Sequence, residues 1–600
     1  MCGIVGVLSR ERPVPSLEAA CRALAHRGPD DAGEWRSDDG RVAFGHRRLS
    51  ILDPSPDGHQ PFVKDGLSLS YNGEVYNFRE LRRELEQRGH SFRSHSDTEV
   101  VLEAYRAFGA DFVRRLRGMF ALGLWDDARQ TLLLARDRLG IKPLFVYQDA
   151  EQVAFASELK ALEQCPGLRL APDESAAYDF LTYLYVPAPK TIYGNVRKVL
   201  PAEVVRVTRD TRGLHVQRSR YWSVDFASAK GPRGQEAVEA VRAALADATR
   251  AHLVSDVPVG CLLSGGIDSS TIATLAAAEM REPLRTFALG FDVAEHSETQ
   301  FAATVAHGIG AQHTEQDVDV AHARTTFQRL NELYDEPFGD LSAIPTLEVC
   351  RLARRSVKVA LSGDGGDEVF GGYGSYARHL RRARWFCWVP ALVQRHAPSR
   401  LARTILRRLR GGPTLIDGLR DPLERHVVIQ GGLTRGDKQD VLPREVLRRF
   451  AGYDDLWAFR AHDRPELDPL TRFQIIDLAT YLPDAILTKV DRASMACSLE
   501  LRPPLLDHEL VELVASIPAA TRNPGGALKS LLKEAMRPRL PEHIVERKKK
   551  GFGVPLQTWI TQLGPGTRRH GSELGSLALE TLRSWAAQHG GPGWARELCA

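Results

Sequence analysis

The feature that most constrains the fold is a succession of short apolar strands, glycine-rich turns and helices in the second half of the chain. Residues 260–263 form an apolar run, followed by a glycine turn and the helical stretch 269–280. Residues 285–289 and 357–361 predict two further strands, with a helix over 299–309 between them. This order indicates βαβ units and a parallel sheet with buried strands. Ligands of such sheets bind beyond the carboxyl ends of the strands, where both glycine turns fall.

The first glycine turn reads Ser264-Gly265-Gly266-Ile267-Asp268-Ser269-Ser270. Its glycines allow successive backbone N–H groups to point inward, and the following helix N-terminus adds positive potential, so the turn favours phosphate or pyrophosphate. The Walker lysine and the Rossmann G-x-G-x-x-G pattern are both missing here, which excludes an ordinary P-loop or dinucleotide site. A tight turn with a serine cap is the structural alternative.

The second glycine turn reads Ser362-Gly363-Asp364-Gly365-Gly366-Asp367-Glu368. Three carboxylates in one turn repel each other unless a cation or ligand offsets their charge. Mg²⁺ held by one or two carboxylates together with substrate phosphates meets that need. An exposed, water-solvated turn is the alternative, but two such turns ending neighbouring strands favour a nucleotide–Mg²⁺ site.

The first 160 residues predict an α+β domain of short strands around a few helices. One helix is expected over 77–88, and a second begins at Ser96-Asp97-Thr98-Glu99, which is a capping-box pattern. Residues 170–235 are rich in Pro, Arg and Tyr and are interpreted as a crossover between domains. The expected strands are residues 4–8, 67–71, 120–125 and 131–135.

Cys2 directly follows the initiator Met1. If Met1 is removed, one residue carries both a thiol and a free α-amino group. With a pKa near 8, that amine can accept the thiol proton and activate the nucleophile without a histidine. Any chain can carry a cysteine at its second position, so the surrounding polar residues decide whether Cys2 is a nucleophile or an incidental cysteine.

Those polar residues suit the recognition of an α-amino acid with a side-chain amide. Arg48 can pair with a carboxylate, and Glu74 and Asp97 can accept an ammonium group. Asn72 with the Gly73 N–H can form an oxyanion hole. Each also has a structural alternative: a surface charge for Arg48, a hairpin turn for Asn72-Gly73 and a first-turn helix residue for Asp97.

Composition excludes several other classes. The 600 residues carry a formal net charge of +4, which supports neither a nucleic-acid nor a membrane argument. The 8 cysteines form no C-x-x-C pair, as expected in a reducing compartment. No signal peptide and no stretch long enough to span a bilayer are apparent, so a cytoplasmic location is expected.

Taken together, the motifs resemble those of the glutamine-dependent asparagine synthetases over roughly residues 2–560. The N-terminal matches are Met1 to Gly6, His26 to Asp30, Arg48 to Asp53 and Tyr71 to Asn77. The C-terminal matches are Ser264 to Ser270, Asp335 to Phe338, Ser362 to Glu368 and Lys548 to Pro555. Asp364 stands where some members carry Glu, one methylene longer.

The resemblance implies an α/β protein of two domains. An αββα N-terminal-nucleophile glutaminase sandwich (2–210) would precede a parallel-sheet α/β ATP pyrophosphatase domain with a helical C-terminal part (235–600). Glutamine would be hydrolysed at Cys2, and the ammonia would pass internally to the second site. There ATP would adenylate a carboxylate, and ammonia would displace AMP.

The resemblance also implies the site residues. The catalytic set would be Cys2, Asn72, Gly73, Asp364 and Arg492. Mg²⁺ would be bound by Asp268 and Asp367. Glutamine would be held by Arg48, Leu49, Ser50, Ile51, Leu52, Asn72, Gly73, Glu74 and Asp97. ATP would be bound by Leu262, Ser264, Gly265, Gly266, Asp268, Ser269, Leu289, Ser362 and Gly363.

A cationic residue is expected beside the activated carboxylate. Counting back from Pro503-Pro504-Leu505-Leu506-Asp507 favours Arg492, with Lys489 one helical turn earlier as the other candidate. A charge on the helix surface is the structural alternative for Arg492.

The leading hypothesis is an ATP-dependent amidotransferase that converts aspartate to asparagine, with glutamine, ATP and Mg²⁺ as its small partners and a homodimer as its assembly. The alternative keeps the chemistry but changes the acceptor to a sugar, a cell-wall precursor or a natural-product intermediate, with 411–455 shaping acceptor access. A tRNA-modifying enzyme and a non-catalytic ammonia sensor are less favoured. The Arg-rich stretches 378–384 and 403–410 are expected to be solvated or dimer-facing.

Overall fold

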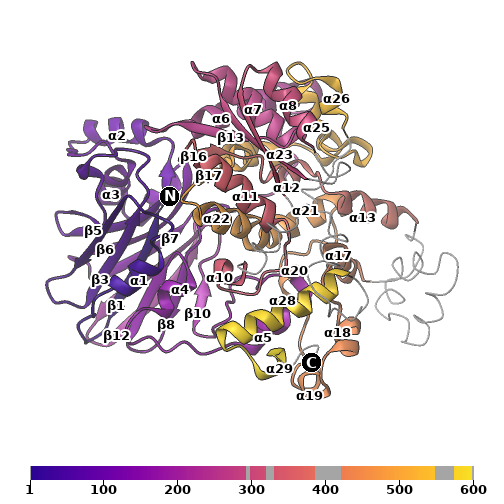
Figure 1. Cartoon of the computed structure of the whole chain (residues 1–600). Helices are drawn as coiled ribbons and strands as arrows, with labels where there is room; N and C mark the ends of the chain where they lie inside the picture. Colours follow the sequence, from indigo (N-terminus) through magenta and orange to yellow (C-terminus); the bar gives the residue numbers. More distant parts are fainter. Residues whose placement is uncertain (1, 292–297, 319–329, 386–420, 548–572, 597–600) are drawn as a thin grey trace.

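The computed structural model describes residues 2–291, 298–318, 330–385, 421–547 and 573–596. Its strand-rich N-terminal half lies beside a larger, mostly helical half, and the two are in extensive contact (Figure 1). Among the described residues, no helix has the length and apolar sequence needed to cross a membrane. The motif 548–555 and the Arg-rich stretch 403–410 lie outside the described residues.

Two six-stranded antiparallel sheets form the N-terminal half. The first has the order β10-β8-β9-β1-β3-β2 and the second the order β12-β11-β7-β6-β5-β4. The strands of the first sheet are β1 (Gly3–Ser9), β2 (Asp31–Arg36), β3 (Val42–Arg48), β8 (Phe145–Gln148), β9 (Gln152–Ala156) and β10 (Val196–Lys198). Those of the second are β4 (Phe62–Lys64), β5 (Leu67–Val75), β6 (Gly118–Asp126), β7 (Thr131–Arg136), β11 (Glu203–Asp210) and β12 (Gly213–Arg220).

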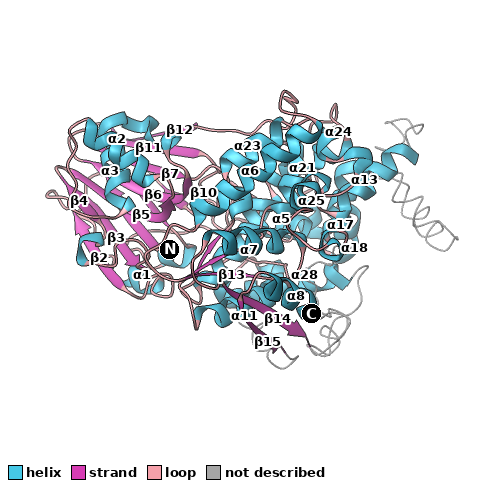
Figure 2. Ribbon diagram, turned by 90° about the horizontal axis from the view of Figure 1, so that it is seen from above, coloured by secondary structure: helices cyan, strands magenta, loops and turns pink. Residues whose placement is uncertain are grey.

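Helices cover the outer face of each sheet, which gives the four-layer αββα arrangement that was expected (Figures 1 and 2). The first sheet packs against α1 (Glu18–Ala23), α4 (Leu159–Glu163) and α5 (Glu174–Tyr183). The second packs against α2 (Phe78–Gln87) and α3 (Asp97–Phe108).

Two details of this half differ from the sequence prediction. Residues 170–235 were interpreted as a crossover, but they supply α5, β10, β11 and β12, so the second sheet extends beyond residue 210. The Ser96–Glu99 capping box is also wrong. Ser96 Oγ does accept from Thr98 N, but the Glu99 carboxylate accepts from the backbone of Arg93 and Ser94 instead of from Ser96. Lys64 also binds Glu99, which draws the carboxylate away from the cap.

The two sheets are held close by one aromatic ring on two glycines. Phe155 lies between Gly6 of β1 and Gly123 of β6, and a Cβ at Gly123 would stand 2.2 Å from its ring. Phe44 packs edge-on against Phe155 at a centroid distance of 5.4 Å. No side chain larger than hydrogen fits at Gly123 without moving the sheets apart.

A parallel five-stranded sheet forms the centre of the second half, with the order β15-β14-β13-β16-β17 and every pairing parallel. The chain moves from β13 outward to β15, then returns to β16 on the other side of β13. The order therefore reverses between β13 and β16, as in a doubly wound fold. The strands are β13 (Val259–Leu262), β14 (Arg285–Phe291), β15 (Gln312–Val318), β16 (Val359–Leu361) and β17 (Glu500–Arg502).

Apolar side chains alternate between the two faces of this sheet. Cys261 and Leu361 join one core and Phe287 and Ala360 the other, as the two-residue period of a strand requires. Helices α6 (Gly234–His252), α7 (Ile267–Glu279), α8 (Thr299–Gly308), α23 (His508–Ser516) and α25 (Ser530–Met536) pack into the first core. Helices α10 (Leu330–Tyr334), α11 (Ala343–Arg354), α17 (Pro422–Gln430), α21 (Pro469–Ala479) and α22 (Leu487–Met495) build the second, with α22 also reaching into the first.

The remaining helices are short except for α13 and α28. They are α12 (Gly366–Phe370), α13 (Gly374–Trp385), α18 (Arg435–Val441), α19 (Arg444–Arg449), α20 (Trp457–Arg460), α24 (Ala519–Arg522), α26 (Glu542–Val545), α28 (Glu573–His589) and α29 (Gly593–Arg596). Helix α28 packs on α5 of the first half, and α18 does so through the Lys438 Nζ contact to the Tyr178 carbonyl at 2.9 Å. The chain thus returns twice to its N-terminal half after leaving it.

Replacing Gly123 by Ala should destabilise the protein by about 1–3 kcal/mol, because the added methyl overpacks the space between the sheets. Thermal unfolding followed by circular dichroism would measure it. Gly308→Ala is the matched control, since a Cβ at the end of α8 meets no atom within 4 Å. Equal melting temperatures for the two variants would contradict this account of the sandwich.

Candidate functional site: two centres joined by buried charges

Cys2 lies immediately before β1 and is 7% exposed. Its backbone N–H donates to Asn72 Oδ1 at 2.8 Å, and its thiol accepts from the Leu49 backbone. Burial raises the pKa of this thiol. Asn72 Nδ2 is buried and has no hydrogen-bond partner within the described protein, so it remains available as a donor beside the thiol. A paired oxygen and an unpaired N–H on one amide suit an oxyanion-hole residue.

The predicted glutamine-binding residues come near Cys2 because the start of β1 lies beside the end of β3, and Asn72 of β5 contacts Cys2. Asn72, Gly73 and Glu74 lie within β5 and not in a hairpin turn, which excludes that alternative. Arg48, at the end of β3, donates to the Leu52 and Ser55 carbonyls at 3.1 and 3.2 Å. Its guanidinium therefore shapes the 49–55 loop, which contains the predicted residues Leu49 to Leu52.

Two buried carboxylates complete this centre. Asp97 Oδ2 accepts from Tyr71 Oη at 2.8 Å and from Val75 N at 3.0 Å, and burial raises the pKa of its carboxyl to about 6. Burial also holds the pKa of Glu74 well above its ordinary range, against the opposing effect of Arg502. Arg502 lies 3.5 Å from Glu74 although it belongs to β17 of the second half. The strand spacing that predicted Glu74 gave no sign of this partner.

The second centre is a cavity of about 1120 Å³ beyond the carboxyl ends of β13 and β16, where the strand order reverses. It is lined by the predicted catalytic residue Asp364 and by most of the residues predicted to bind ATP or metal, namely Leu262, Ser264, Gly266, Asp268, Ser269, Leu289, Ser362, Gly363 and Asp367. Gly265 is the exception. It has φ +72°, and a Cβ there would meet Phe301 and Ala302, so this glycine serves the turn and its packing on α8.

Glycine allows the two loops of this cavity to touch. A Cβ at Gly363 would stand 2.7 Å from Ser269 N, at the start of α7. The carboxylate-rich turn therefore lies directly against the helix N-terminus that ends the first glycine turn. Phosphate groups in the cavity would meet the positive end of α7 and the aspartates of both turns together.

Asp268 and Asp367 converge on one cation, the Lys529 ammonium. Lys529 Nζ lies 2.6 Å from Asp367 Oδ1 and also pairs with Asp268 Oδ2. Lys529 takes the left-handed conformation (φ +55°) just before α25, which is costly for a side chain with a Cβ. The carboxylates that were predicted to bind Mg²⁺ do share one site, and sequence analysis missed the lysine that lies in it. Its sole sequence signal is a basic residue after Gly525-Gly526.

The structure places Arg492 away from this cavity. In helix α22, Lys489 lines the cavity, whereas Arg492, about one turn further along, pairs with Glu158 of the first half at 2.7 Å. Lys489 Nζ contacts Ser342 Oγ at 2.7 Å and Asp340 at 3.1 Å. Burial raises the pKa of Asp364, and Lys489 opposes this. Counting residues along a helix cannot reveal which side chain faces the cavity, so Arg492 stays a prediction that the described cavity lining does not support.

The Asp335–Phe338 motif also lies at the junction of the halves and not in the cavity. Asp335 accepts from Leu159 N at 3.0 Å and pairs with Lys160 at 3.1 Å. Glu336 accepts from Ile192 N at 3.0 Å. Of the stretch 411–455, which was expected to shape acceptor access, Gln430 lines the cavity, whereas α18 packs on the first half.

Comparison with known proteins matches both halves. A family model described as asparagine synthase matches residues 240–584, and one described as glutamine amidotransferase domain matches residues 1–222. Glutamine-hydrolysing asparagine synthetase 1 of Bacillus subtilis is 33% identical over 93% of this chain and 88% of its own length. Asparagine synthetase 3 of the same organism is 30% identical over 92% and 87%.

A relative with a different name has similar coverage. The amidase chry2 of Gibberella zeae is 28% identical over 91% of this chain and 86% of its own length. The matched regions contain both centres described above. The chain belongs to the asparagine synthase family and is a two-domain, glutamine-dependent amidotransferase of the ligase class.

Proposed function

We propose that this ATP-dependent amidotransferase takes ammonia from glutamine at Cys2 and transfers it to aspartate, forming asparagine, AMP and diphosphate. The observation that carries the proposal is the pairing, in one chain, of a buried Cys2–Asn72 centre with a cavity between two glycine turns. The first suits amide hydrolysis, and the second suits a nucleotide with its phosphates at a helix N-terminus.

At the first centre, the Cys2 sulfur attacks the glutamine side-chain amide, and Asn72 Nδ2 with Gly73 N stabilises the oxyanion. Arg48, Glu74 and Asp97 hold the substrate's carboxylate and ammonium groups, with residues 49–52 as one wall. Removal of Met1 would convert the Cys2 nitrogen, which already contacts Asn72 Oδ1 at 2.8 Å, into the amine that accepts the thiol proton.

At the second centre, Leu262 and Leu289 flank the adenosine, and the turns Ser264–Ser269 and Ser362–Gly363 cradle the phosphates. A carboxylate oxygen of the acceptor attacks the α-phosphorus and diphosphate leaves. Ammonia then attacks the acyl carbon and AMP leaves. Lys489 is the cation best placed to meet the acceptor carboxylate, and Asp364 lies beside it.

Mg²⁺ fits the donor set of this cavity. Among the described residues, no cluster of three or more His, Cys, Asp or Glu side chains is arranged to hold a metal by itself. Asp268 and Asp367 nevertheless converge on one point, and Mg²⁺ is commonly held by two carboxylates plus substrate phosphates. The ion would neutralise charge on the departing diphosphate. A homodimer and a cytoplasmic location remain predictions.

A different carboxylate acceptor is the second candidate. The cavity extends beyond the two glycine turns to Tyr373, Arg378 and Gln430. The amidase chry2 matches this chain over 86% of its own length, so a relative of similar extent carries a name other than asparagine synthetase. Acceptor identity is therefore the part of the proposal that needs the most direct test.

Diphosphate release should depend on aspartate. The enzyme with ATP, Mg²⁺ and glutamine is assayed against a panel of carboxylates, with no acceptor as the blank. We expect release with aspartate and the matching formation of asparagine and glutamate. If diphosphate is released with another acid but not with aspartate, that acid is the acceptor, and the proposed amidotransferase chemistry still holds.

Cys2→Ala should abolish glutamine-dependent synthesis, by at least about 10³-fold, because no thiolate remains to attack the amide. Synthesis from added ammonium salt should continue at a rate within twofold of the unmodified enzyme. Cys21→Ala is the control, since Cys21 is buried in the same half and lies outside the centre. Continued use of glutamine by Cys2→Ala would overturn the assignment.

Lys529→Met should tighten the binding of Mn²⁺ to the ATP-free enzyme by about tenfold, which corresponds to ~1.4 kcal/mol. Without the ammonium, Asp268 and Asp367 repel each other and favour a divalent ion. Titration calorimetry or the Mn²⁺ spin-resonance signal would measure it. Lys533→Met, one turn further along α25 and facing Glu546, is the control. Weaker binding by Lys529→Met would show that the lysine assists the metal.

A further inference from the structure

Helix α22 connects the two centres. Near its start, Lys489 lines the cavity, and two residues later Asp491 contacts the first half. At 3.6 residues per turn, these positions lie about 200° apart around the helix axis. One helix therefore presents one side chain to the acceptor cavity and another, on its opposite face, to the glutaminase half.

Asp491 binds Arg27, which follows α1 in the first half. Arg27 Nη1 and Nη2 donate to the two carboxylate oxygens of Asp491 at 2.8 and 2.9 Å, across 464 positions of sequence. Both residues are buried, with Arg27 0% and Asp491 4% exposed. A bidentate pair fixes the plane of the guanidinium as well as its position.

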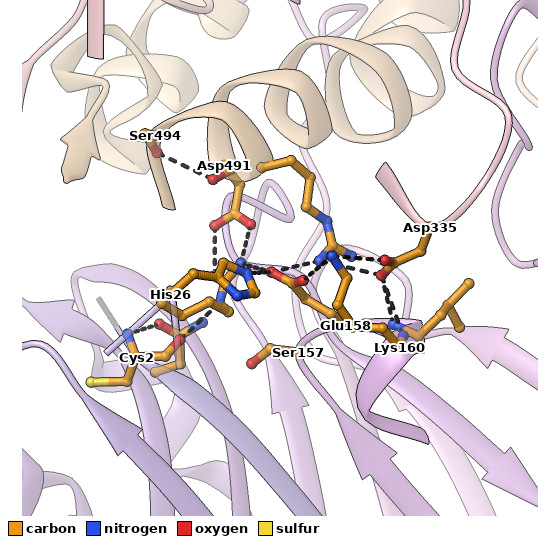
Figure 3. A network of polar contacts seen from close by, with 12 residues as sticks. Cys2, His26, Ser157, Glu158, Lys160, Asp335, Asp491 and Ser494 are labelled. Atoms are coloured by element: carbon orange, nitrogen blue, oxygen red, sulfur yellow. Dashed lines mark hydrogen bonds and ion pairs between the residues drawn. The ribbon is translucent and has the colours of Figure 1, made fainter. Parts of the chain in front are cut away.

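Arg27 in turn holds the main chain of the nucleophile. Its Nε donates to the Cys2 carbonyl at 3.0 Å. The Cys2 N–H is already held by Asn72, so the two polar groups of this peptide segment are fixed from opposite sides. Figure 3 shows the succession from Cys2 upward to Asp491 on the helix.

Glu158 alone cannot fix the orientation of the Arg27 guanidinium. Its carboxylate, 1% exposed, is shared by Arg27 at 2.7 Å, Arg492 at 2.7 Å and His26 at 3.1 Å. Lys160 also approaches it, at 3.4 Å. Glu158 contacts Arg27 through one oxygen, whereas Asp491 contacts it through two, so Asp491 determines the angle of the guanidinium.

We propose that Asp491, a residue of the synthetase half, is a positioning residue for the Cys2 nucleophile of the other half and acts through Arg27. The inference deepens the proposed function, since it rests on Cys2 as the nucleophile. It makes the glutaminase centre incomplete without α22. Glutamine contacts are not involved, so the effect falls on the reactivity of Cys2 and not on substrate binding.

Asp491→Asn tests this in the full-length enzyme, because it keeps the side chain's shape and removes its charge. We expect the kcat of glutamine hydrolysis to fall about tenfold with KM within twofold. Alkylation of Cys2 by iodoacetamide, followed by mass spectrometry of the N-terminal peptide, should slow in parallel. Synthesis from ammonium salt should stay within twofold.

Asp484→Asn is the matched control. Asp484 is also buried at the junction of the halves, just before α22, but it accepts from Ala188 N at 2.7 Å and does not contact Arg27. It should leave both kcat and Cys2 alkylation within twofold. Arg27→Lys is a second test, since it keeps the charge but loses the planar fork, and it should reproduce the fall in kcat.

Three results would overturn the proposal. They are unchanged kcat and alkylation in Asp491→Asn, a rise in KM at constant kcat, and an equal loss of the ammonium-dependent activity, which would mean a general role at the junction. If Asp491→Asn does not fold, Arg27→Lys decides in the same way. Alkylation of Cys2 needs no acceptor. If the proposed acceptor is wrong, the synthesis assay gives no product, but the alkylation rates of the variants can still be compared.

Discussion

The Arg27 guanidinium is buried between the halves of the molecule, and the surrounding structure must supply partners for its charge and its hydrogen bonds. A charged group taken out of water costs several kcal/mol unless its hydrogen bonds and its charge are both matched. Arg27 binds the Cys2 carbonyl at the start of the chain, Glu158 just before α4, and Asp491 of α22. These contacts require the halves to lie in one relative position.

Other ion pairs across the junction follow the same rule. Arg502 of β17 faces Glu74 of β5, and Lys198 of β10 lies 3.0 Å from Glu336. Arg117 pairs with Asp507 at 2.8 Å. Because charged pairs depend steeply on distance and leave costly orphans when separated, they specify a docking geometry more sharply than apolar contact does.

Local sequence could predict those parts of the site that lie on one strand and its following turn. That class contains the glycine turns after β13 and β16, the β5 triplet Asn72–Glu74, and Cys2 at the buried start of β1. Strand periodicity and the positions of glycine are local signals, so each of these parts could be predicted. The αββα fold followed from recognisable motifs and not from periodicity alone.

What sequence could not predict is contact between distant segments. The partners of Arg27 and Glu74 lie hundreds of positions away, and nothing in the spacing of Lys489 and Arg492 shows which one enters the cavity. Lys529 lies just before α25, and no local sequence pattern indicates that its ammonium group reaches Asp268 and Asp367. Strands β10 to β12 were missed because the Pro and Arg content of this region obscured their strand pattern. Pairing with β8 of the first sheet places β10, and pairing with β7 of the second sheet places β11 and, beside it, β12.

The reach of Arg502 and Asp491 into the first half bears on how such proteins can be recombined. A glutaminase half exchanged between relatives at the boundary of its own sheets would leave Glu74 and Arg27 buried without their partners. A functional chimaera must therefore carry β17 and α22 from the same parent, although both lie more than 250 residues beyond the end of that half. The glutaminase half, α22 and β17 must therefore be exchanged together, although they are separate in the sequence.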